Sequence, residues 1–110
     1  MQYVPVGDLN HSTFVDKANS KFRLHINETQ TMELVLNEVG ELHTTRWQEY
    51  FSIVFLAPDS PILPQRIYKM EHDQIGIFEL FLTPIAKDED GVRYEAVFNH
   101  VIKKRQSQTQ

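Results

Sequence analysis

The chain has 110 residues, of which 41% are hydrophobic and 24% charged, values typical of one globular domain rather than of a disordered chain. It contains no cysteine, which excludes disulfides, thiolate metal sites and cysteine nucleophiles. The formal net charge of −4 and the shortness of the apolar stretches argue against nucleic acid and a membrane as partners.

The amino-terminal segment has neither the basic region nor the apolar core of a secretory signal, so we expect a cytoplasmic protein. The first predicted element is a short helical turn between Leu9 and Ala18, with Asn10 or Ser12 as its N-cap. We recognise no capping box in this segment. After it the hydrophobic period changes to two, which is typical of strands.

The first strand is predicted over residues 21–26, and the second begins near Met32 and ends at Gly40. Residues 41–48 fit no clear pattern. The run from Tyr50 to Leu56 is apolar on both faces, which predicts a central strand covered on both sides. The prolines that follow at a spacing of three predict a rigid extended connector, although the spacing also resembles a polyproline ligand. They are Pro58, Pro61 and Pro64.

Three further strands are predicted near residues 65–71, 77–86 and 92–102. A turn at residues 88–91 would pair Lys87 with Val92, and a turn at residues 72–76 would pair Glu71 with Ile77. Counting back along the second hairpin places Phe81 opposite Phe98, Thr83 opposite Ala96, Ile85 opposite Tyr94 and Glu79 opposite His100. Counting along the first places Lys69 opposite Glu79 and Ile67 opposite Phe81.

The strand over residues 77–86 is therefore central in a meander and is apolar on both faces. A flat sheet cannot cover two apolar faces, so the sheet must curl into a small barrel or pack as a sandwich. The sequence predicts a mainly all-β domain over residues 1–102, with about six antiparallel strands and a short N-terminal helical turn. Residues 103–110 are wholly polar and predict a disordered tail.

The predicted register brings together one polar cluster, Lys69, Glu79 and His100, which is the candidate site of this chain. If shielded from water, such a cluster could tune a proton-transfer group. The alternative, a cross-strand ion pair with a structural role only, is the favoured interpretation. We assign no catalytic residue, metal ligand or cofactor-binding residue.

Other motifs have structural explanations. The histidines lack metal-ligand spacing, and Glu71 and His72 should point to opposite faces of a strand, which argues against a shared acid–base site. The acidic run at residues 88–91 resembles a fragment of a calcium loop but lacks its full spacing, so a turn is favoured.

Several stretches together resemble a family of small bacterial domains of unknown function. They are FSIVFLAP, LPQRIYKMEH, IGIFELFLTPI and GVRYEAVFN, with a weaker similarity in KFRLHI and MELVLNEV. The resemblance spans most of residues 14–101. It implies no catalytic residues, because the family has no known function.

We expect a non-enzymatic module that binds a protein partner or its own copies through a sheet edge. The predicted strand over residues 21–26 is the candidate edge, because Arg23 and His25 occupy its outward positions. A small barrel that binds an apolar or carbohydrate ligand is the alternative, and an enzyme is the third hypothesis.

Overall fold

The structure, a computed structural model, describes residues 1–102, and the predicted tail over residues 103–110 lies outside the described residues. About 57% of the described residues lie in strands, which confirms the mainly β fold class. No helix in the described part of the chain is long and apolar enough to cross a bilayer. The elements are η1 (Val6–Asp8), α1 (His11–Val15), β1 (Lys21–His25), β2 (Thr31–Val39), β3 (His43–Thr44), β4 (Gln48–Ala57), β5 (Arg66–His72), β6 (Gly76–Asp88) and β7 (Gly91–Val101).

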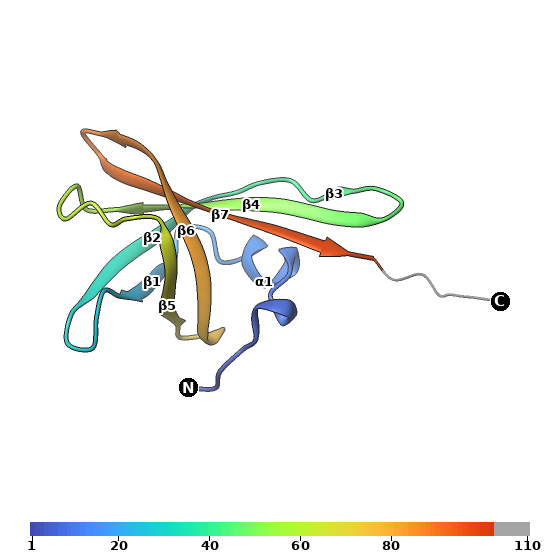
Figure 1. The fold of residues 1–110 in the computed structure, drawn as a ribbon, viewed down its shortest axis with the longest axis horizontal. Coiled ribbons are helices and arrows are strands. Elements are labelled where there is room, and N and C mark those ends of the chain that lie inside the picture. The colour runs from blue at the N-terminus through green and yellow to red at the C-terminus, as the bar shows by residue number, and fades with distance from the viewer. Residues whose placement is uncertain (103–110) are drawn as a thin grey trace.

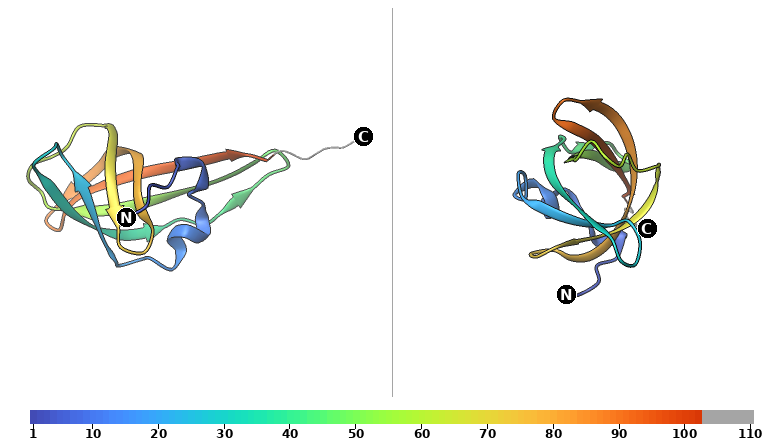
Figure 2. Two further views of the ribbon diagram at one scale, coloured as in Figure 1. Left: turned by 90° about the horizontal axis from the view of Figure 1, so that it is seen from below. Right: turned by 90° about the vertical axis from the view of Figure 1, so that its left-hand side faces the viewer.

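The strands form a closed antiparallel barrel (Figures 1 and 2). The sheet order is β2-β1-β5-β6-β7-β4-β3, and an additional β2–β4 pairing closes the ring of six strands. β1 pairs with β2 on one side and with β5 on the other, so the prediction that residues 21–26 form a free edge is wrong. Its polar outward residues face solvent because they lie on the outer surface of the barrel.

The hairpin of β5 and β6 has the predicted register. Lys69 is opposite Glu79, Ile67 is opposite Phe81, and Glu71 is opposite Ile77. One further pair, His72 with Gly76, shortens the connection relative to the predicted loop. Gly76 has a positive φ of 122°, a conformation that strongly favours glycine.

The predicted register of β6 with β7 is correct only next to the turn. Lys87 is opposite Val92, as predicted, but a β-bulge at Ile85 then shifts the pairing by one residue. Pro84 has no N–H to donate to a ladder, which suits it to a bulge. Thr83 is therefore opposite Glu95 instead of Ala96.

The shift overturns the predicted pairs beyond the bulge. Pro84, and not Ile85, is opposite Tyr94, and the β6–β7 pairing ends at Thr83–Glu95. Phe81 is 51% exposed on the outer surface, whereas Phe98 is buried. The outer face of β6 was expected to be covered, and it is exposed.

Aromatic side chains fill the barrel, and α1 closes one end of it. Phe14 of α1 is fully buried, with its ring centroid 5.4 Å from that of Phe98 and 6.4 Å from that of Phe22. α1 begins with a capping box that sequence analysis missed: the Asn10 side chain accepts from the Thr13 backbone N–H, and the Thr13 hydroxyl accepts from the Asn10 backbone N–H. Threonine here takes the place of the usual glutamate or glutamine.

β6 and β7 separate beyond the bulge, and the amino-terminal segment pairs with the freed part of β6. Val4 N–H donates to the Ile77 carbonyl (2.7 Å), and Ile77 N–H donates to the Gln2 carbonyl (2.9 Å). β7 instead continues beside β4, and β3 pairs with the other side of β4. These strands extend past the barrel toward the right of Figure 1. We call residues 43–52 with residues 96–101 the arm.

Candidate functional site

The structure does not assemble the predicted cluster of Lys69, Glu79 and His100. Lys69 and Glu79 are cross-strand partners on β5 and β6, as predicted. His100 lies opposite Glu49 of β4, and β6 no longer pairs with β7 at that point. The bulge at Ile85 shifts the ladder on which the prediction depended, and that ladder ends at Thr83–Glu95.

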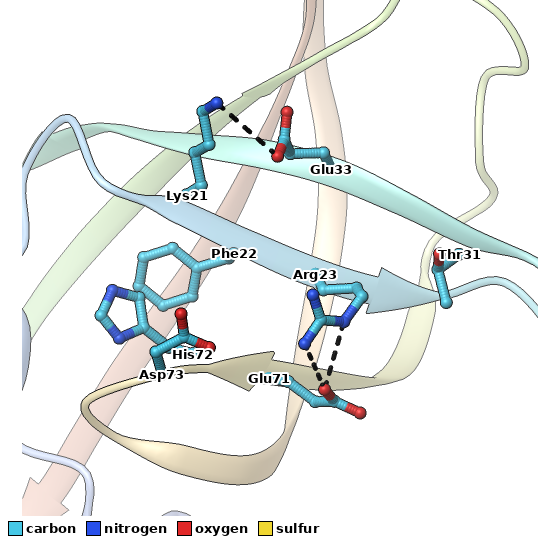
Figure 3. Close-up of a pocket in the computed structure, with 8 residues that line it drawn as sticks. All are labelled: Lys21, Phe22, Arg23, Thr31, Glu33, Glu71, His72 and Asp73. Carbon is cyan, nitrogen blue, oxygen red and sulfur yellow. Dashed lines mark hydrogen bonds and ion pairs between the residues drawn. The ribbon is translucent and has the colours of Figure 1, made fainter.

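A different polar cluster lies beside this hairpin, around Glu71 of β5 (Figure 3). One carboxylate oxygen accepts from Arg23 Nη2 (2.7 Å) and Nε (3.2 Å), and the other accepts from His25 Nε2 (2.6 Å). The hydrogen bonds from Arg23, and then the hydrogen bond from His25, hold the pKa of Glu71 below its ordinary value. A carboxylate with both oxygens engaged is suited to tying β1 to β5 and is poorly suited to accepting a substrate proton.

His72 points the opposite way from Glu71, as the sequence predicted, and its side chain is buried. It is 6% exposed, and its ring lies 4.5 Å from that of Phe22. Its Nδ1 accepts from the Gln74 backbone N–H (3.0 Å), so the proton of the neutral ring is on Nε2. Nε2 then donates to the Ser20 hydroxyl (2.9 Å). Burial, and secondly the charge of Lys17, lower the pKa of His72.

The contact of Ser20 with His72 is structural, although a serine beside a histidine can be a nucleophile and its base. The Ser20 hydroxyl donates its proton to the Lys17 carbonyl, so it has none to give to the ring. The ring nitrogen that faces it is already protonated. The pair therefore joins the segment after α1 to the β5–β6 turn. A groove of about 350 Å³ lies outside this junction, lined by Lys21, Phe22, Arg23, Thr31, Glu33, Glu71, His72 and Asp73 (Figure 3).

Within residues 1–102, no group of three or more His, Asp or Glu side chains is arranged to hold a metal ion. The barrel interior is filled by its own side chains, and its two largest buried side chains are bonded to the β4–β5 connector. The Tyr94 hydroxyl accepts from the Leu63 backbone N–H (2.8 Å), and the Tyr68 hydroxyl donates to the Pro64 carbonyl. The β4–β5 connector therefore packs against the barrel interior and closes one end of the barrel.

The arm has an open edge along β7. Ile102 N–H donates to the Trp47 carbonyl (2.7 Å), which fixes the phase of the β4–β7 ladder. Because hydrogen-bonding direction alternates along a strand, the backbone groups of Val97, Asn99 and Val101 point away from β4. No other segment of the described chain pairs with β7 after Glu95. Sequence analysis missed this edge because it took β6 to pair with β7 along its whole length.

The side chains of this edge do not protect it. Val97 is 67% exposed and Val101 is 72% exposed. Edge strands commonly avoid further pairing by means of charged residues, proline or a bulge. Residues 96–101 read AVFNHV and contain neither an acidic residue nor lysine, arginine or proline. On β4 beside them, Tyr50 is 40% exposed and stacks on His43 of β3 at 5.0 Å.

The comparisons with known proteins agree with the resemblance found in the sequence. The model of a family described as a domain of unknown function, DUF6916, matches residues 9–98. No curated protein and no solved structure matches the chain. The match begins just before α1, includes the whole barrel and ends within the arm, at Phe98. It covers far more than half of the 110 residues, and the chain therefore belongs to this family.

Proposed function

We propose that this domain is a non-enzymatic protein-association module whose open β7 edge binds an extended strand of a partner. One observation carries the proposal: the backbone groups of Val97, Asn99 and Val101 point away from β4 into an edge that no described segment covers. Addition of a strand satisfies such groups with main-chain hydrogen bonds, while side chains on the exposed face supply specificity. The exposed valines would bury apolar surface in that complex and so remove it from water.

The site around Glu71 and His72 supports this choice over an enzyme. The Glu71 carboxylate accepts hydrogen bonds from Arg23 and His25. The ring of His72 is hydrogen-bonded to Ser20 and Gln74. The ligand-binding alternative has less support, because aromatic side chains occupy the barrel interior. A barrel of six strands is narrow enough for its own side chains to fill it.

The decisive variant is Asn99→Pro. Proline removes the N–H that points to the open edge. It leaves the β4–β7 ladder intact, because the N–H of Asn99 points away from β4 and β6 does not pair with β7 at this position. The matched control is Ile62→Lys, which changes a 52% exposed apolar residue in the β4–β5 connector, at the end of the barrel away from the arm (Figure 2).

Tagged wild-type protein and both variants are passed through lysate of the native organism, and retained proteins are quantified by mass spectrometry. We expect the wild type and Ile62→Lys to retain the same protein in stoichiometric amount and Asn99→Pro to lose it. Retention of the same proteins by all three would contradict the proposed function, as would retention of none by a wild-type chain that also shows no self-association.

A further inference from the structure

We infer that the strand bound at this edge is β7 of a second copy, in an antiparallel pair centred on Asn99. The inference rests on the proposed function of the open edge and adds the identity of the partner and the register. Two identical strands related by a two-fold axis form a closed, isologous contact, which stops at a dimer.

Hydrogen-bond direction restricts the register. The groups available at the edge belong to alternate residues, Val97, Asn99 and Val101. A two-fold axis at Asn99 places Asn99 opposite itself and Val97 opposite Val101 of the second copy. All three residues of each strand then lie in hydrogen-bonded pairs, in which each residue donates its N–H to the C=O of its partner.

Neighbouring registers use the edge less well. An axis at Phe98 pairs Val97 with Asn99 of the second copy and moves Val101 toward Glu95, which already pairs with Thr83 of β6. An axis at His100 pairs Asn99 with Val101 of the second copy. The backbone groups of Val97 then have no partner among the described residues of that copy. Only the axis at Asn99 pairs every residue whose backbone points to the open edge.

The side chains agree with the same register. On the exposed face, Val97 of each copy meets Val101 of the other, so that the two exposed valines of β7 cover each other. Asn99 meets its own copy, and an amide can donate to and accept from another amide. On the inner face, Phe98 is opposite His100 of the second copy. None of these pairs opposes like charges, which would weaken a cross-strand pair.

The absence of cysteine makes the register directly measurable, because any introduced cysteine is the only one in the chain. In the inferred dimer the Cα atoms of the two Asn99 residues lie about 5.5 Å apart, within the range of about 4.4–6.8 Å that a disulfide spans. The two Val97 residues lie four positions apart along the strands, roughly 13 Å, which is too far.

We expect Asn99→Cys to form a disulfide dimer on mild oxidation and Val97→Cys alone to form none. A mixture of Val97→Cys with Val101→Cys should form the mixed dimer. Equal crosslinking of all single variants, or crosslinking of Val97→Cys alone, would overturn the register.

Sedimentation velocity over a concentration series tests the dimer itself. The wild type and Ile62→Lys should associate, and Asn99→Pro should raise the dimer dissociation constant at least about tenfold, because two central hydrogen bonds are lost. Val97→Lys should act in the same direction.

The wild type could stay monomeric and yet capture from lysate a protein that Asn99→Pro does not capture. That result would overturn the second copy as partner and leave the proposed function standing. A dimer that both edge variants leave unchanged would show that another surface forms it, which would overturn the inference as well.

Discussion

His72 is a titratable side chain that the fold buries, and its partners hold the ring neutral. Gln74 N–H donates to one ring nitrogen and the Ser20 hydroxyl accepts from the other. Protonation would place a second proton on Nδ1, where only another donor faces it. Lys17 disfavours the charged ring, and Asp73 partly offsets that effect.

This arrangement predicts a loss of stability in mild acid. Burial lowers the pKa of His72 below the ordinary value of 6.5, so the unfolded chain binds the proton first as the pH falls. Its contribution to the free energy of unfolding is therefore complete above about pH 6.5 and decreases below it. The melting temperature of the wild type should fall between pH 7.5 and pH 5.5.

The variant His72→Leu tests the assignment. It should cost about 1–3 kcal/mol at pH 7.5, because Ser20 and Gln74 lose a partner, and its melting temperature should depend less on pH than that of the wild type. His43→Gln, at an exposed position, is the control and should keep the wild-type dependence. An unchanged pH dependence in His72→Leu would assign the titration to another group.

Residue contacts were predictable from the sequence only where a short turn fixed which residues of the two strands lie opposite each other. The pairing of Glu71 with Ile77 follows from the short β5–β6 connection. The contacts of Glu71 with Arg23 and His25 join positions 48 and 46 residues apart, across β1 and β5, and no turn connects those strands. Pairing of strands far apart in sequence depends on barrel closure, which the alternation of residues does not specify.

At the scale of the elements, a bulge and a short helix decide the shape. Ile85 ends the regular pairing of β6 with β7, and the only signal in the sequence is Pro84 inside an otherwise regular strand. α1 has only five residues, too few to be stable alone, so it depends on its cap and on Phe14. The other strands of the described chain were predictable from an apolar period of two or a continuous apolar run, whereas β3 was not, because residues 41–48 follow neither pattern.

Phe14 should therefore be the residue through which α1 stabilises the barrel. Phe14→Ala would leave a cavity against Phe22, Phe78 and Phe98 and should lower the free energy of unfolding by about 3–5 kcal/mol. Val15→Ala, at a neighbouring position that is 51% exposed, should change it by less than about 0.5 kcal/mol. Urea unfolding of both variants measures the difference, and similar costs for the two would mean that α1 does not pack as described.

At the scale of the whole molecule, closure concentrates the open strand edges at the arm. Around the barrel each strand of the described chain has a neighbour on both sides, and the amino-terminal segment covers part of the freed edge of β6. β3 is only two residues long, so β7 offers the longer template for an added strand. The separation of β6 from β7 thus creates both the arm and the edge on which the proposed association depends.

Amide hydrogen exchange along β7, followed residue by residue by nuclear magnetic resonance, tests the open edge most directly. In dilute protein, the amides of Val97, Asn99 and Val101 should exchange quickly and those of Phe98 and His100 slowly, since only the latter point to β4. At high concentration the three fast amides should become protected as the second copy binds. Equal protection of both sets in dilute protein would show that the edge is already covered and would contradict the account.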